Sequence, residues 1–273
     1  MFDGQMIAFI GSGTMAEAMI RGLLVGNVVQ AEQILAAGPR TERGEALAAR
    51  HGVAVTCDNA AAAEAGQVVV LAVKPQVVPV VLPELRGHLR RQDLLLSIVA
   101  GMPIRRLADG AAHAAVVRAM PNTPAQIEQG ISVWTATAEV DQLQRDRAQA
   151  VLAALGEEIY VDHEGDLDKA TALSGSGPAY VFMMMEAMID AGVHLGFSRR
   201  IARQLVFRTM AGSVAYAEQS GKHVAELRNQ VTSPGGTTAA ALYHLEKGGL
   251  RTVISRGLWA AFERSRSLGA RED

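Results

Sequence analysis

Residues 6–16 read Met-Ile-Ala-Phe-Ile-Gly-Ser-Gly-Thr-Met-Ala, and this stretch decides the fold of the first half of the chain. An apolar run suited to a buried strand ends at Gly11, and a helical pattern over 15–24 follows at once. Gly11 permits a tight turn, Gly13 lets the backbone approach a pyrophosphate, and Ala16 keeps helix and strand close. This order is typical of dinucleotide binding, with the pyrophosphate at the helix N-terminus. A tight turn that binds nothing would use the same glycines.

The first 160 residues repeat this alternation of strand and helix. Eight short runs rich in β-branched residues are separated by Ala-, Glu- and Arg-rich stretches with helical spacing. Such alternation predicts βαβ units and a mainly parallel sheet. Two of the runs are almost continuously apolar, as expected for strands covered on both faces. The expected strands are 6–10, 33–37, 53–55, 68–73, 94–99, 115–118, 131–134 and 157–161.

Beyond about residue 163 the strand signals stop and helical patterns follow. We expect an α/β fold in which residues 1–164 form a Rossmann-type dinucleotide-binding domain and residues 165–273 form an all-α domain. Ser198 is suited to cap one helix and Gly221 to end it. The apolar runs in this half favour an oligomer, since they offer more surface than one subunit can cover. The expected helices are 180–195, 198–220, 223–230, 238–247 and 251–267, and the apolar runs are 181–185 and 258–262.

Composition narrows the function classes. The 273 residues carry 26 Lys+Arg against 28 Asp+Glu, which argues against a nucleic-acid partner because such a partner requires a basic face. A single cysteine, Cys57, rules out an internal disulfide, and the seven histidines lack metal-ligand spacing. No apolar run reaches the ~18 residues that cross a bilayer, and the N-terminus lacks the pattern of a signal peptide. We expect a cytoplasmic protein without a metal or a membrane partner.

The end of the second expected strand bears on the choice of cofactor. An NAD site usually places Asp or Glu there to bind the ribose hydroxyls, whereas residues 36–41 read Ala-Ala-Gly-Pro-Arg-Thr. The guanidinium of Arg40 and the hydroxyl of Thr41 match the oxygens of a 2′-phosphate. We therefore expect NADP rather than NAD, although Arg40 could equally be a solvated surface residue.

Two further strand ends carry candidate cofactor contacts. The run 68–73 leads into Lys74-Pro75, where Pro75 fixes the turn and Lys74 could face the cofactor, because open α/β sheets bind ligands at the carboxyl ends of strands. The run 94–99 leads into Ala100-Gly101, small residues that leave room for a flat ring. Either segment could equally be an ordinary loop.

Three later segments carry candidate substrate contacts. Residues 120–124, Met-Pro-Asn-Thr-Pro, form a loop that two prolines stiffen and that presents an amide and a hydroxyl. Residues 172–180 place serines and glycines between helical stretches. Residues 231–238, Val-Thr-Ser-Pro-Gly-Gly-Thr-Thr, gather hydroxyls and glycine amides at a helix N-terminus, which is a cradle for a carboxylate. A stiff connector, a close helix crossing and an elaborate helix cap are the respective alternatives.

No catalytic dyad accompanies these segments. The sequence contains no Gly-x-Ser-x-Gly elbow, no paired-carboxylate motif and no Cys–His nucleophile arrangement. A nicotinamide would carry the hydride, so the protein mainly has to bind and orient its ligands.

Five motifs together resemble those of the pyrroline-5-carboxylate reductase family, in the family's order and over nearly the whole chain. The resemblance implies reduction of 1-pyrroline-5-carboxylate to L-proline by NAD(P)H, the last step of proline biosynthesis. It also implies a helical dimerisation domain after the Rossmann domain, and a homodimer that can assemble as a pentamer of dimers. The motifs are Gly11-x-Gly13-x-x-Ala16, Ala72-Val73-Lys74-Pro75, Met120–Pro124, Leu173–Tyr180 and Val231–Thr238.

The resemblance also assigns roles to residues. Thr238 would be catalytic, with its hydroxyl nearest the ring nitrogen of the substrate. The implied substrate-binding residues are Ser233, Gly235, Gly236, Thr237 and Thr238. The implied cofactor-binding residues are Gly11, Ser12, Gly13, Thr14, Met15, Ala16, Arg40, Asn59, Ala72, Val73, Lys74, Pro75, Ala100 and Gly101. To this expected set we add Thr41, for the 2′-phosphate, and Asn122. The tip of the second strand varies within the family, so the choice between NADPH and NADH does not follow from it.

Two other classes of protein stay open. An NADP-dependent 3-hydroxyacid or 6-phosphogluconate-type dehydrogenase combines a similar cofactor domain with a helical domain, and it uses a lysine of the helical part as acid and base. Lys169, Lys222 and Lys247 are the lysines there, and none lies in a glycine-rich helical motif of that kind. A non-catalytic NADP-binding protein would keep residues 11–16 without needing the 231–238 loop.

Overall fold

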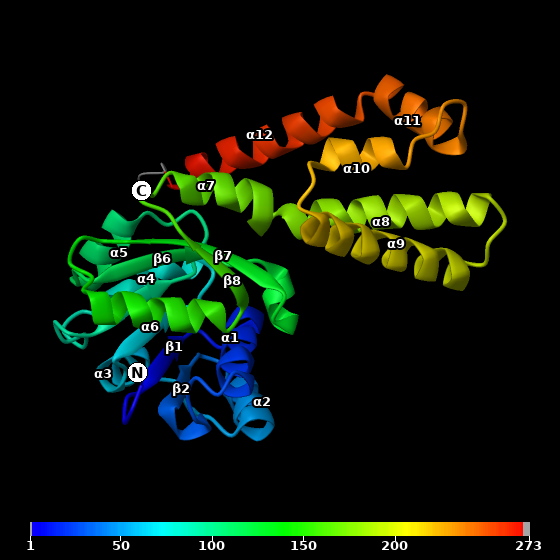
Figure 1. Cartoon of the computed structure of the whole chain (residues 1–273). Helices are drawn as coiled ribbons and strands as arrows, with labels where there is room; N and C mark the ends of the chain where they lie inside the picture. Colours follow the sequence, from blue (N-terminus) through cyan, green and yellow to red (C-terminus); the bar gives the residue numbers. More distant parts are fainter. Residues whose placement is uncertain (1, 270–273) are drawn as a thin grey trace. The chain divides into compact units, whose positions relative to one another are not determined.

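A computed structural model describes residues 2–269 (Figure 1). The chain forms two compact units, the first made of residues up to Ser176 together with the stretch from Ala261, and the second of Gly177–Ala260. This division differs from the boundary expected after residue 164. Residues 165–176 pack with the first unit, and α12 (Leu250–Gly269) returns the chain to it.

One eight-stranded sheet forms the centre of the first unit. The strands lie in the order β3-β2-β1-β4-β5-β6-β7-β8, and all neighbours pair parallel except β6 and β7. Each strand lies within two residues of an expected run, so the predicted α/β fold with a mainly parallel sheet is confirmed. The strands are β1 Ile7–Ile10, β2 Ile34–Ala37, β3 Ala54–Thr56, β4 Val68–Leu71, β5 Leu94–Ser97, β6 Val116–Met120, β7 Gly130–Ala136 and β8 Gly156–Tyr160.

Helices cover both faces of this sheet. Side chains alternate along a strand, so Ile7 and Phe9 of β1 join one apolar cluster while Ala8 and Ile10 join the other. Helices α1 and α6 pack on the first face, and α3, α4 and α5 pack on the second. The helices of this unit are α1 Thr14–Val25, α2 Thr41–His51, α3 Asn59–Ala65, α4 Val78–Glu84, α5 Ile104–Ala111, α6 Gln142–Ala153 and α7 Asp166–Ala170.

The parallel strands β1, β2, β4, β5 and β6 all end at one edge of the sheet. Backbone hydrogen bonds hold the loops there, since Gly11 N–H donates to the Ala37 carbonyl at 2.9 Å and Ala72 N–H to the Ile10 carbonyl at 2.8 Å. Strand order reverses at β1, which has β2 on one side and β4 on the other. Open α/β sheets bind their ligands at such a point.

The second unit is entirely helical. Helices α8 (Gly177–His194) and α9 (Arg199–Ser220) lie side by side (Figure 1), and α10 (Val224–Gln230), α11 (Thr237–Lys247) and the first part of α12 follow. The expected caps of α9 are confirmed: Ser198 Oγ accepts from Ile201 N–H at 3.4 Å, and Gly221 ends the helix with a left-handed φ of 61°.

This helical unit buries little apolar surface of its own. No residue of α8 is buried, and α9 buries only Ala202 and Val206 among the residues the structure describes. Large apolar side chains stay exposed along the helices, and Leu195, directly after α8, is 82% exposed. No helix among residues 2–269 is long and apolar enough to cross a membrane. The other exposed apolar residues include Phe182, Met183, Val214, Tyr243, Val253 and Trp259.

Candidate active site

The turn between β1 and α1 is shaped for a close approach of backbone and ligand. Gly11 has a φ of +108°, and a Cβ there would lie 2.7 Å from the Ala72 carbonyl oxygen, so only glycine fits. Gly13 precedes the first residue of α1, and a Cβ there would meet nothing within 4 Å. Ala16 is fully buried against the sheet. The space in front of Gly13 is therefore open, and it lies at the N-terminus of α1, where the helix stabilises an anion.

The loop after β2 places two predicted residues at the same edge. Arg40 precedes α2 and Thr41 begins it, and both side chains are exposed. With Arg43 they line a shallow hollow on the surface. The Thr41 hydroxyl lies 3.8 Å from the Cys57 sulfur. A guanidinium and a hydroxyl are thus available at the tip of the second strand, and the neighbouring Glu42 lines the same hollow.

The remaining predicted cofactor residues occupy neighbouring loops. Asn59 is the first residue of α3, and its amide nitrogen donates to Glu84 Oε2 at 2.7 Å. Lys74 and Pro75 are exposed after β4. Asn122 follows β6, where its side-chain oxygen accepts from Ile131 N–H at 3.0 Å and fixes the connection to β7. Four others lie after β4 and β5: Ala72, Val73 and Ala100 are half-buried, and Gly101 is buried.

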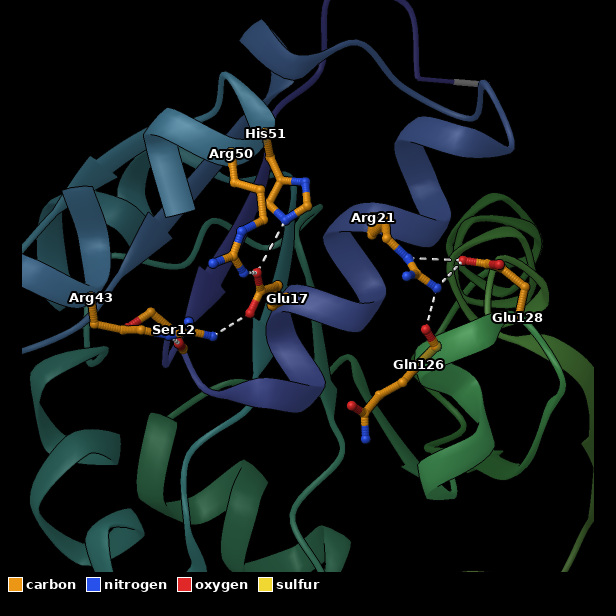
Figure 2. Close-up of polar contacts among 8 residues, drawn as sticks. All are labelled: Ser12, Glu17, Arg21, Arg43, Arg50, His51, Gln126 and Glu128. Atoms are coloured by element: carbon orange, nitrogen blue, oxygen red, sulfur yellow. Dashed lines mark hydrogen bonds and ion pairs between the residues drawn. The ribbon is translucent and has the colours of Figure 1, made fainter. Parts of the chain in front are cut away.

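Sequence reasoning missed a cluster of charged residues beside the glycine turn (Figure 2). Glu17, in the first turn of α1, pairs with Arg43 of α2 at 2.5 Å, with Arg50, and with His51 at 3.3 Å. Arg43 Nε also donates to the carbonyl oxygen of Ser12 at 2.9 Å. No local pattern of charges predicts this cluster, because its members come from two helices.

The cluster keeps Glu17 ionised. Burial alone would raise the pKa of this carboxyl, but hydrogen bonds from Arg43 and His51, the charge of Arg43 and a hydrogen bond from Arg50 outweigh burial. The pKa of Glu17 is therefore held below its ordinary value of 4.5.

A second charged contact ties the same helix to the loop after β6. Arg21 lies one turn beyond Glu17 on α1, and its Nη2 is 2.7 Å from Glu128 Oε1 (Figure 2). The same nitrogen donates to the Gln126 carbonyl. Helix α1 is thus braced to α2 on one side and to the loop that contains Asn122 on the other.

A buried arginine holds together the elements that follow the sheet in sequence. Arg118 of β6 is 5% exposed, and its guanidinium lies 2.8 Å from Glu164 Oε1 and 3.7 Å from Asp168 Oδ1. Glu164 also accepts from Ile104 N–H at 2.7 Å, and Asp168 accepts from Ser265 Oγ at 2.6 Å. This network explains why residues 165–176 and the end of α12 pack with the first unit.

In the second unit, the 231–238 segment forms the loop between α10 and α11 and the first two residues of α11. Gly235 has a left-handed φ of +70°, which favours glycine, and a Cβ on Gly236 would lie 2.5 Å from Ser233 Oγ and would displace that hydroxyl. Gly236 precedes α11 without a capping side chain, which leaves the first N–H groups of the helix to other acceptors. Thr237 and Thr238 are the first two residues of α11, and Thr238 is half-buried.

A Rossmann-type sheet, a glycine turn open to an anion and a helical second unit define an NAD(P)-dependent oxidoreductase. Two family models match: pyrroline-5-carboxylate reductase dimerisation over residues 164–268, and NADP oxidoreductase coenzyme F420-dependent over residues 6–101. Pyrroline-5-carboxylate reductases of Synechocystis sp. and Pseudomonas aeruginosa are 40% and 42% identical over 96% of this chain, and over 98% and 96% of their own lengths. The chain belongs to the pyrroline-5-carboxylate reductase family.

Solved structures agree with this assignment. Pyrroline carboxylate reductase of Plasmodium falciparum, solved with NADP bound, is 30% identical with a TM-score of 0.91, and covers 99% of this chain and 100% of its own. The Coxiella burnetii enzyme is 36% identical with a TM-score of 0.90, and covers 98% and 99%. A 3-hydroxyisobutyrate dehydrogenase of Mycobacterium tuberculosis, at 20% identity, shares the fold alone. The hydroxyacid dehydrogenase alternative is therefore not favoured.

Proposed function

We propose that this chain reduces 1-pyrroline-5-carboxylate to L-proline with a hydride from NAD(P)H, the last step of proline biosynthesis. The observation that carries the proposal is the relationship over the whole chain to enzymes named for this substrate. The single cysteine suits a reducing compartment and supports a cytoplasmic location.

The first unit fits a nicotinamide dinucleotide, because Gly11 allows the turn and Gly13 opens toward free space. When bound, the reduced nicotinamide supplies the hydride. Arg40 and Thr41 would bind a 2′-phosphate, which favours NADPH; the NADP bound to the Plasmodium falciparum relative supports this choice. We assign cofactor binding to Gly11, Ser12, Gly13, Thr14, Met15, Ala16, Arg40, Thr41, Asn59, Ala72, Val73, Lys74, Pro75, Ala100, Gly101 and Asn122.

The loop before α11 would bind the substrate, which is a cyclic imine that carries a carboxylate. The amides of Gly235, Gly236 and Thr237 lie at a helix N-terminus, where the helix dipole stabilises an anion. Ser233 would add its hydroxyl, and Thr238 would hydrogen-bond the ring nitrogen. No strong acid is needed, because the imine can arrive protonated and its C5 is then electrophilic. The chain would mainly orient its ligands, an effect worth up to ~7–11 kcal/mol in favourable cases.

We propose a homodimer built through the helical half, residues 165–273, with residues 1–164 as the cofactor domain. The scarcity of buried side chains in α8 and α9 supports this proposal, because exposed apolar helices need a partner. Dimers could assemble further into a pentamer of dimers.

A matrix of substrates and cofactors tests the function. The purified chain is assayed with 1-pyrroline-5-carboxylate and with 3-hydroxyacids, each with the phosphorylated and the unphosphorylated nicotinamide cofactor. We expect turnover of 1-pyrroline-5-carboxylate, with a higher kcat/KM for NADPH than for NADH. Oxidation of a hydroxyacid without pyrroline reduction would contradict the proposal, as would cofactor binding without any turnover.

A further inference from the structure

Arg43 contacts both the carboxylate of Glu17 on α1 and the backbone of the glycine turn (Figure 2). Its Nη2 pairs with Glu17 at 2.5 Å, and its Nε donates to the carbonyl oxygen of Ser12 at 2.9 Å. The side chain is 26% exposed and that of Glu17 is 17% exposed, so water screens this pair only partly. Glu17 also binds Arg50 and His51, so its carboxylate is fixed from three sides.

The contact with Ser12 sets the direction of a neighbouring amide. The Ser12 carbonyl and the Gly13 N–H belong to one peptide group, which is planar and trans, so they point in opposite directions. When Arg43 holds the carbonyl toward α2, the Gly13 N–H must point away from α2. On the other side, Glu17 N–H donates to the Gly13 carbonyl at 3.0 Å and starts α1. The peptide between Ser12 and Gly13 is thus held by Arg43 through its carbonyl, while the helix holds the next peptide, between Gly13 and Thr14.

We propose that Arg43 is a positioning residue for the dinucleotide: it orients the Gly13 amide toward the pyrophosphate, and Glu17 holds Arg43 in place. The inference rests on the proposed cofactor site. Two arginines that line one hollow then have different roles. Arg40 is exposed and suited to the 2′-phosphate, which only NADPH carries, whereas Arg43 acts on the pyrophosphate, which NADPH and NADH share.

Binding of four probes to Arg43→Ala tests this role: NADPH, NADH, ADP-ribose, which keeps the pyrophosphate but lacks the 2′-phosphate, and 2′-AMP, which keeps the 2′-phosphate but lacks the pyrophosphate. We expect Kd to rise about tenfold for the first three and to change less than twofold for 2′-AMP, with kcat at saturating cofactor retained. Arg40→Ala should instead weaken NADPH and 2′-AMP alone. Arg50→Ala removes another partner of Glu17 that reaches no atom of the turn, and should change no Kd more than twofold.

A loss confined to NADPH and 2′-AMP in Arg43→Ala would overturn the inference, since it would make Arg43 a phosphate ligand, and so would four unchanged affinities. If Arg43→Ala does not fold, Arg43→Lys keeps the charge without the fork and should show the same pattern at smaller size. A wild type that binds the probes but does not reduce 1-pyrroline-5-carboxylate would refute the proposed function and leave this inference standing. A wild type that binds no dinucleotide would refute both.

Discussion

Thr238 carries the most specific residue assignment in the proposed reaction. It is the second residue of α11 and is half-buried, and the glycines before it leave the helix start uncapped by a side chain. A hydroxyl held there can donate to or accept from a ring nitrogen without titrating near neutral pH. Its contribution is therefore orientation and hydrogen bonding rather than proton storage.

Replacing Thr238 by alanine should lower kcat/KM for 1-pyrroline-5-carboxylate by about tenfold to a hundredfold, as a lost ~1.4–2.7 kcal/mol of transition-state stabilisation would. Steady-state kinetics at saturating NADPH measure the effect. Thr238→Ser keeps the hydroxyl and should stay within a few-fold of the wild type. An unchanged rate in Thr238→Ala would remove this residue from the mechanism.

Glu17 provides a pH-dependent contribution to stability. Its pKa is lowered in the folded state, so its ionised form stabilises the fold above its ordinary pKa of 4.5, and this contribution is lost as pH falls below that value. Glu17→Gln should lower Tm by about 2–4 °C at pH 7, which is what ~1 kcal/mol does in a chain of this size. The difference in Tm between the two proteins should shrink below pH 4.5 in calorimetry. A gap that stays constant down to pH 3 would contradict the assignment.

At the scale of elements, the eight strands were predictable, whereas the contacts that hold α7 and the end of α12 were not. Strand positions follow from short apolar runs and their spacing, which are local properties of the sequence. The domain division depends on Arg118, whose partner Glu164 is 46 residues away in sequence. Similarly, Arg43 and Glu17 are 26 residues apart, so no local pattern shows that they meet.

Arg118→Ala removes the buried guanidinium that pairs with Glu164 and Asp168. We expect the variant to lose about 2–3 kcal/mol of unfolding free energy. This is less than the ~3–5 kcal/mol of a fully buried pair, because Glu164 is partly exposed. Hydrogen exchange should rise in residues 166–170 and 261–269. Arg105→Ala removes an exposed pair with Asp109 and should change stability by at most ~0.5 kcal/mol. Unchanged exchange at 261–269 would argue against the network.

At the scale of the whole molecule, the two halves of the chain differ in how much of their apolar surface is buried. The sheet unit holds two apolar clusters, while α8 exposes Phe182 at 61% and Met183 at 63%. The apolar runs in the sequence and the exposed apolar side chains of α8 support the same proposal, that the helical half binds a second copy. The number of copies in the assembly cannot be predicted from local sequence patterns, because it depends on the shape of surfaces formed by residues distant in the chain.

Light scattering should therefore give at least twice the chain's mass of 28.9 kDa at assay concentration. Phe182→Glu places a charge on the exposed face of α8 and should increase the monomer fraction. Arg105→Glu, a charge change in the sheet unit, serves as the matched control and should leave the mass unchanged. A wild type that stays near 29 kDa would contradict the proposed dimer.

Transfer of the hydride itself tests the central claim most directly. The wild-type chain is given 1-pyrroline-5-carboxylate with NADPH that carries deuterium at C4 of the nicotinamide, once on each face of the ring, and the product is analysed by mass spectrometry. We expect L-proline one dalton heavier, with the label at C5, from one of the two cofactor preparations. Unlabelled proline from both preparations, or no proline at all, would contradict it.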